Sequence, residues 1–223
     1  MAQRFERERE GDVLIQPSAE QRPEGFAQRL ITQAFTPPLL RRILREGFMS
    51  HGKEIPAHHP VREMFHSLTE RGLKQSQLSD REIHQYLSNL LVEFIHVENL
   101  YKVRGEAGRR LEHVMDMLEK AEDPSPMDKR EIYQHVGDFT LFALGLFPES
   151  LQHGKRCISL NYYADQGRRS YRIRWEMENY RSTVAIFRKL SEQFEGCVFT
   201  LNWVRNYIRD PFYQYMFREF DIV

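Results

Sequence analysis

The apolar residues between positions 187 and 208 limit the folds open to this chain more than any other feature. They recur with alternating gaps of three and four positions, which is the spacing of one face of an α-helix. The set is Phe187, Leu190, Phe194, Cys197, Leu201, Val204 and Ile208. A face with this spacing packs knobs into holes against neighbouring helices. The segment therefore predicts a bundle of helices and not a fold built on a sheet.

The rest of the chain repeats this helical spacing and shows no sustained alternation typical of strands. A capping box, Ser79 to Glu82, precedes a long apolar face that includes Ile83, Leu87 and Phe94. Helices are predicted over 25–35, 36–47, 61–71, 80–102, 106–121, 126–146, 156–178 and 187–208. The second half of the 126–146 helix is apolar on all sides, which is typical of a helix at the centre of its domain.

These segments together predict an all-α fold. We expect an antiparallel helical bundle of about four to five long helices with short N-terminal helices. Residues 1–22 are polar and lack periodicity, so they are expected to form a flexible or surface-lying arm. Residues 23–223 are expected to form a single helical-bundle domain, because one hydrophobic core can extend through a chain of this length.

The charge balance and the cysteine content narrow the classes of partner and compartment. Lys plus Arg and Asp plus Glu each number 32, so the chain lacks the net positive field typical of nucleic-acid-binding proteins, and no nucleic-acid partner is expected. The apolar stretch 139–147 is about half as long as a membrane span, and the N-terminal residues lack the apolar core of a signal peptide. With Cys157 and Cys197 as the two cysteines, the sequence predicts a cytoplasmic protein without a membrane span.

Two Glu-x-x-His pairs, Glu63/His66 and Glu93/His96, are the sharpest chemical candidates. This spacing places a carboxylate and an imidazole on one helix face, as in di-iron bundle proteins. On the 80–102 helix, however, Glu93 and His96 lie well away from the apolar face. We therefore interpret both pairs as solvated polar positions. Neither a metal site nor any other cofactor is predicted.

The densest group of possible ligands to a metal combines Glu63 and His66 with two histidines of the preceding loop, His58 and His59. The loop can fold back onto the next helical turn. The spacing matches no template of cysteines or paired histidines for zinc. A cluster at the protein surface is expected.

The run His135, Val136, Gly137 and Asp138 is similar to the Gly-Asp segment of the distal helix of haem oxygenases, where glycine lets the backbone approach a flat cofactor. The resemblance implies His135 and Asp138 as candidate binding residues. The first histidine of the chain, His51, lies in a predicted loop, so the proximal histidine of that family has no counterpart. The alternative is that Gly137 allows a second helix to pack closely.

Two further features concern charged side chains. Glu98 falls within the apolar face of the predicted 80–102 helix, so it is expected to point inward and to need a partner, which makes it a third candidate binding residue. The 156–178 helix interleaves arginines, among them Arg168 and Arg174, with aromatic side chains. Its acidic residues offer intrahelical ion pairs, so an ion-paired surface is expected there instead of a nucleic-acid site.

Three segments of the second half of the chain resemble bacterial all-helical proteins to which no activity is assigned. They are YLSNLLVEFIHVENLY (86–101), VGDFTLFALGLFPESL (136–151) and NYYADQGRRSYRIRWE (161–176). The resemblance implies a bacterial origin and a helical fold and transfers no residue role.

The chain lacks the motifs of the common enzyme classes, such as the nucleophile elbow, the P-loop and the dinucleotide fingerprint. The leading hypothesis is therefore a non-enzymatic protein that acts through self-association, as a homo-oligomer, or through a protein partner. The alternative is a bundle that binds a small molecule or a cofactor of the metal or haem type, with or without enzymatic activity.

Overall fold

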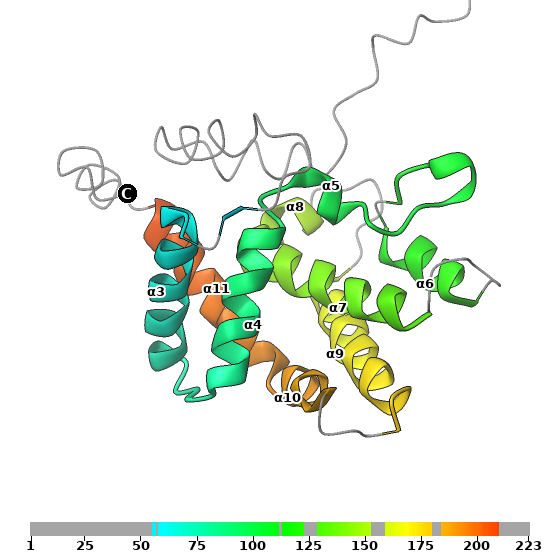
Figure 1. Ribbon diagram of the computed structural model, residues 1–223. Coiled ribbons are helices and arrows are strands. Elements are labelled where there is room, and N and C mark those ends of the chain that lie inside the picture. Colours follow the sequence, from blue (N-terminus) through cyan, green and yellow to red (C-terminus); the bar gives the residue numbers. More distant parts are fainter. Residues whose placement is uncertain are drawn as a thin grey trace, which may run out of the picture.

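Figure 1 shows the computed structural model, which describes residues 55–56, 58–111, 113–122, 129–152, 159–179 and 184–209. The regular elements in these ranges are helices, and the one pairing of extended backbone is an isolated bridge between Arg104 and Arg110. The predicted all-α fold is confirmed. The predicted arm 1–22 and the predicted helices 25–35 and 36–47 lie outside the described residues.

The helices follow one another along the chain with short connections. They are α3 Pro60–Gln75, α4 Arg81–Glu93, α5 Val97–Leu100, the 3-10 helix η1 Glu106–Gly108, α6 Val114–Glu122, α7 Lys129–Leu146, α8 Pro148–Gln152, α9 Leu160–Glu176, α10 Ala185–Glu192 and α11 Phe194–Arg209. The predictions over 126–146 and 156–178 are confirmed within a few residues by α7 and α9. None of the helices in the described ranges combines the length and the apolar character needed to cross a lipid bilayer.

Helix α7 lies at the centre of this arrangement. All its side chains from His135 to Leu146 are buried, and it contacts α4, α6, α8, α9 and α11. At the side of this core, α3 and α4 form an antiparallel pair, and α11 packs against both α3 and α7 (Figure 1). Helix α11 therefore joins the α3/α4 pair to the rest of the core.

A glycine sets how closely α11 approaches α7. A Cβ atom on Gly145 would lie 2.4 Å from the Cβ of Leu201, a separation that real Cβ atoms essentially never show. Leu201 itself is fully buried. The absent side chain of Gly145 is thus what lets the two backbones come together at this crossing.

The predicted 187–208 helix is two helices. Helix α10 ends at Glu192. Its C-cap Gln193 has φ and ψ of −114° and 27°, outside the helical range, and α11 starts at the next residue. The apolar face stays buried from Phe187 to Val204, while Ile208 is partly exposed. Helix α10 packs against α9 and α4, whereas α11 packs against α7 and α3. A single straight helix would not follow both surfaces, which accounts for the break.

The predicted 80–102 helix ends early. Helix α4 stops at Glu93, Phe94 is its C-cap, and the chain turns before α5 begins. Phe94 and its neighbour Ile95 are both buried. The chain therefore leaves the helix at a point where its side chains are still buried.

The turn also corrects the prediction for Glu98. This residue lies in α5 with its side chain 66% exposed, and its carboxylate oxygens are each 3.0 Å from a guanidinium nitrogen, one of Arg104 and one of Arg110. The inward position predicted from the helical wheel is wrong, because the helix on which it was drawn has already ended. Glu98 is a surface ion-pair residue.

Replacing Glu98 with Ala is therefore expected to change the free energy of unfolding by no more than about 0.5 kcal/mol, as is usual for surface ion pairs. Urea denaturation of the variant and the parent at neutral pH measures this difference. A loss above about 1.5 kcal/mol would show that the two ion pairs hold the 98–110 segment in place.

The predicted 106–121 helix begins later than expected. Ala107 and Gly108 have φ angles of 53° and 75°, in the left-handed region, and they form the turn between the bridged residues Arg104 and Arg110. Helix α6 starts only at Val114. The predicted 61–71 helix, by contrast, is longer than expected: the observed helix α3 continues for about one more turn, to Gln75.

Candidate binding cavity

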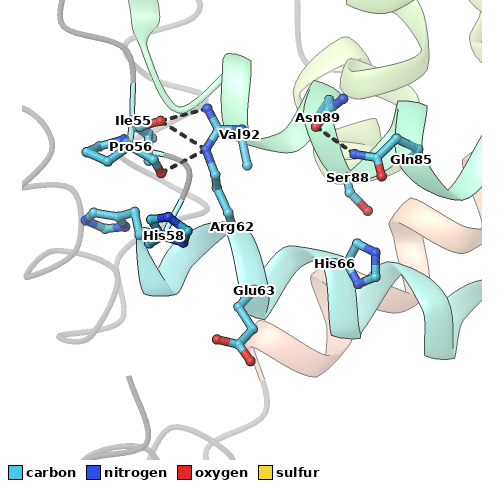
Figure 2. Close-up of a pocket in the computed structure, with 11 residues that line it drawn as sticks. Ile55, Pro56, His58, Arg62, Glu63, His66, Gln85, Ser88, Asn89 and Val92 are labelled. Carbon is cyan, nitrogen blue, oxygen red and sulfur yellow. Dashed lines mark hydrogen bonds between the residues drawn. The ribbon is translucent and has the colours of Figure 1, made fainter.

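A cavity of about 790 Å³ lies between α3, α4 and the segment that precedes α3 (Figure 2). Most of the side chains that line it are polar or titratable. They are Ile55, Pro56, His58, His59, Arg62, Glu63, His66, Gln85, Ser88, Asn89 and Val92. The cavity therefore brings together residues from three separate stretches of the chain.

The first wall of the cavity is formed by residues 55–56 and 58–59, and Arg62 of α3 hydrogen-bonds to the first two. Arg62 donates from Nε to the carbonyl oxygens of Ile55 and Pro56, at 3.0 and 3.1 Å, and from Nη2 to that of Ile55 at 2.7 Å. His59 is the N-cap of α3, and its Nδ1 accepts a hydrogen bond from the amide of Val61 at 3.2 Å. The following proline, at the first helical position, is tolerated there because that position needs no amide donor.

The opposite wall is the polar face of α4. Gln85 donates from Nε2 to Oδ1 of Asn89 at 3.2 Å, so the two side chains lie along one stripe of the helix. The hydroxyl of Ser88 donates to the carbonyl of His84 at 2.8 Å. Val92, one turn further on, is buried. Figure 2 shows this stripe facing α3 across the cavity.

A pair of histidines connects the two helices beside the cavity. The rings of His66 on α3 and His84 on α4 have centroids 4.1 Å apart, and Nε2 of His84 lies 2.9 Å from the carbonyl oxygen of His66. Glu70 lies one turn beyond His66, and its hydrogen bond from Lys74 lowers the pKa of its carboxyl. His66 thus lies on the face of α3 that also carries the ion pair between Glu70 and Lys74.

The predicted cluster of His58, His59, Glu63 and His66 is brought together, since all four line this cavity. Figure 2 shows Glu63 directed away from Arg62 and the 55–56 segment. Within the described ranges, no three side chains of His, Cys, Asp or Glu are grouped so that they could hold a metal ion. The four residues therefore form part of the lining of the cavity.

The second Glu-x-x-His pair is not part of the cavity. Glu93 is the last residue of α4, and His96 is the N-cap of α5, so the two do not share a helix face. The prediction that they lie on one helix is wrong because of the turn at Phe94. Glu93 is exposed, and His96 is half-buried with no hydrogen-bond partner at Nε2 among the described residues.

Comparisons with known proteins returned no match. No protein-family model, curated protein or solved structure is similar to this chain at a significant level. The interpretation of the site therefore rests on its own geometry, and the resemblance of three segments to bacterial helical proteins stays an expectation.

A second polar group is buried inside the core, around Asp138 of α7. Its Oδ1 accepts hydrogen bonds from the hydroxyl groups of Tyr86 at 2.5 Å and Tyr171 at 2.7 Å. Burial raises the pKa of Asp138 to about 7, although the two hydrogen bonds act in the opposite direction. The two hydrogen bonds connect α7 to α4 through Tyr86 and to α9 through Tyr171, so this carboxyl holds three helices together inside the core.

His135, one turn before Asp138, is also buried. Burial lowers the pKa of its imidazole to about 4, so the ring is neutral at pH 7. Its Nε2 has no hydrogen-bond partner among the described residues, and the rings of Phe94 and Phe139 lie beside it. The predicted candidates His135 and Asp138 are thus core residues that lie outside the lining of the cavity.

The space beside Gly137 is filled by the side chain of Tyr171. A Cβ atom on Gly137 would lie 2.6 Å from Cε1 of that ring, so glycine is needed for α9 to pack on α7. This geometry agrees with the helix-packing alternative for Gly137. It gives the resemblance to the haem oxygenase helix no support at this position.

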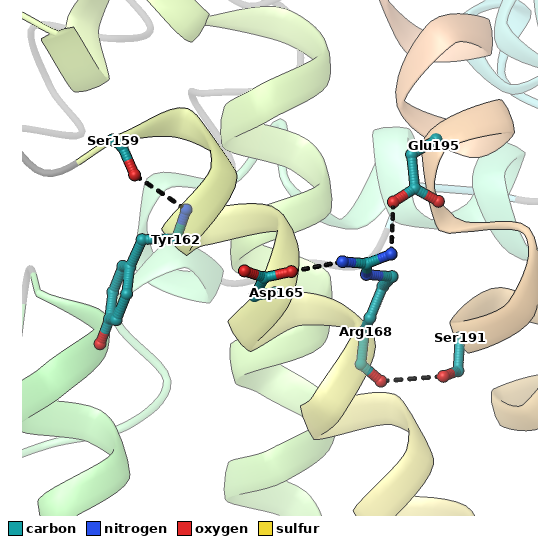
Figure 3. Close-up of polar contacts among 6 residues, drawn as sticks. All are labelled: Ser159, Tyr162, Asp165, Arg168, Ser191 and Glu195. Carbon is teal, nitrogen blue, oxygen red and sulfur yellow. Dashed lines mark hydrogen bonds and ion pairs between the residues drawn. The ribbon is translucent and has the colours of Figure 1, made fainter.

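Two arginines of α9, Arg168 and Arg174, form ion pairs, and Figure 3 shows those of Arg168. Its guanidinium pairs with Asp165 on the same helix and lies 2.9 Å from the carboxylate of Glu195 on α11. Its carbonyl oxygen accepts a hydrogen bond from Ser191 of α10 at 3.0 Å. Arg174 pairs with Glu178 at 3.1 Å. These contacts agree with the expected ion-paired surface and tie α9 to its neighbours.

Several residues of both polar groups were not identified from the sequence. The stripe of Gln85, Ser88 and Asn89 had a signal, because polar residues recur at helical spacing on the face opposite the apolar one. Tyr86 and Tyr171 had none, since they meet Asp138 from positions far apart in the chain.

Proposed function

We propose that this protein binds a small polar molecule in the cavity between α3 and α4. The observation that carries the proposal is the convergence of polar side chains from residues 58–59, α3 and α4 on one cavity of about 790 Å³. Ligand sites for small molecules are typically about 300–1,000 Å³ in volume and carry a few placed polar groups. The cavity has both properties.

Hydrogen bonds within the cavity walls indicate that the site is formed before a ligand binds. The 55–56 carbonyls are held by Arg62, and Ser88 is hydrogen-bonded to its own helix, so these groups are fixed before any ligand enters. Fixed polar groups lose less conformational entropy on binding than flexible ones do. Small-molecule binding was the alternative to self-association or a protein partner at the level of sequence, and the cavity makes it the preferred function.

The test is a survey of chemical classes by isotope-edited NMR. The chain has nine histidines, and labelling them with ¹³C gives one ring signal for each. The purified full-length protein is titrated with organic acids, phosphate esters, sugars and amines at millimolar concentrations. We expect at least one class to shift the signals of His58, His59 and His66 saturably and to raise the thermal midpoint, because a ligand that binds only the native state stabilises it.

The signal of His113, an exposed residue outside the cavity lining, is the internal control and should stay unchanged. His58→Gln and His66→Gln assign two of the three shifted signals and leave His59 as the third. Both residues are exposed, so the fold should tolerate the changes. If no class produces a saturable shift of the cavity histidines, the proposed function is wrong.

A further inference from the structure

We infer that the ligand of this cavity is a small organic anion with a carboxylate, sulfate or phosphate group. The inference rests on the proposed function and adds the chemical class of the ligand. It follows from the donor groups of the two walls that meet no acceptor among the described residues.

The strongest donor is the guanidinium of Arg62, which carries a permanent charge. Its Nε and Nη2 are occupied by the carbonyls of Ile55 and Pro56, while Nη1 meets no acceptor among the described residues. The cavity also lies at the first turn of α3, a helix of sixteen residues whose N-terminal end carries a partial positive charge. An acidic group placed here would receive both effects.

The other wall offers neutral donors for the body of the ligand. The amide group of Gln85 is turned toward Asn89, so Oδ1 of Asn89 is used, whereas its Nδ2 meets no acceptor among the described residues. Asn89 is exposed to the cavity and to solvent. A polar ligand that spans the cavity can place its charge near Arg62 and accept a hydrogen bond from Asn89.

One carboxylate, that of Glu63, is among the lining residues. Figure 2 shows it directed away from Arg62, so it leaves the guanidinium open to an acidic group of a ligand. Its negative charge still opposes an anion in the cavity.

The first experiment compares probes that differ only in charge. Isothermal titration calorimetry on the full chain at pH 7 measures succinate against succinamide, and glucose 6-sulfate against glucose. We expect each anion to bind at least about tenfold more tightly than its neutral partner.

The second experiment changes the charge of the lining. Glu63→Gln removes the one lining carboxylate and should tighten anion binding about threefold or more, a gain that damage to the fold would not produce. His66→Gln removes an imidazole from the lining and should weaken anion binding. Arg62→Lys keeps the charge but loses the fork and should also weaken binding. The matched controls Glu176→Gln and His113→Gln, both exposed and outside the lining, should behave as the parent.

The outcomes separate the inference from the function on which it rests. If succinamide, glucose or the cation putrescine shifts the cavity histidines while the anions do not, the anion assignment is wrong and the binding function stands. Weaker anion binding in Glu63→Gln would also overturn the anion assignment. If none of the anionic, neutral or cationic probes binds, both the assignment and the proposed function fail.

Discussion

Ending the chain after residue 184 is expected to leave a protein that no longer unfolds cooperatively. The deletion removes α10 and α11, whose buried apolar side chains pack on α9, α7 and α3. They are Phe187, Leu190, Phe194, Cys197, Leu201 and Val204. Full burial of such a side chain contributes about 1.5–3 kcal/mol, so their loss is about as large as the whole stability of a typical domain, about 5–15 kcal/mol.

Circular dichroism during thermal and urea denaturation, together with binding of a hydrophobic dye, measures this outcome. A point variant guards against a deletion that is merely insoluble. Leu201→Ala, on the Gly145 crossing, should cost about 2–5 kcal/mol, whereas Phe199→Ala on the same helix, with its side chain 52% exposed, should cost less than about 1 kcal/mol. Cooperative unfolding of the shortened chain with an unchanged midpoint would contradict the central role of α11.

The second large effect concerns how the free energy of unfolding depends on pH. Two buried residues of α7, Asp138 and His135, contribute to it with opposite signs, so single variants should change the dependence strongly. Asp138 has a pKa of about 7 in the folded protein against an ordinary value of 3.8. Between these values the folded state holds a proton that the unfolded state lacks. The stabilising contribution is therefore present at low pH and is lost as pH rises through this window, by about 4 kcal/mol in all.

His135 acts in the opposite direction. Its pKa is about 4 in the folded protein against an ordinary 6.5, so between these values the unfolded state holds the extra proton. The free energy of unfolding then rises as pH rises through this window, by about 3 kcal/mol. From about pH 4 to pH 6.5 the two residues of α7 nearly cancel each other.

Single variants should remove the cancellation. Relative to the parent, Asp138→Asn is expected to gain about 3 kcal/mol of stability between pH 4.5 and pH 7, and His135→Gln is expected to lose a similar amount over the same range. The double variant should follow the parent. Urea denaturation at four or five pH values measures these differences, and other groups with lowered pKa values, such as Asp80 and Glu149, contribute equally to all four proteins.

Parallel pH profiles for the parent and both single variants would show that neither group changes its protonation on folding. The neighbours that act on this pair are the hydroxyls of Tyr86 and Tyr171, with Glu93 and Lys102 further away.

The sequence by itself determined the helical class and the faces of the longest helices. The apolar face from Phe187 to Val204 is buried as its spacing predicts, and the all-round apolar half of α7 lies at the centre of the core. Both results depend on local geometry, since 3.6 residues per turn decide which side chains share a face whatever the helix packs against.

The tertiary structure alone decided where those helices break and which polar groups meet. Helix α4 ends at Glu93 although the apolar spacing of the sequence continues to Phe94, and the turn that follows carries Glu98 to the surface. The cavity exists because Arg62 holds the 55–56 segment opposite the polar stripe of α4. Helical spacing relates a residue only to its own helix, whereas a break or a site depends on which surfaces of several helices can be buried at once.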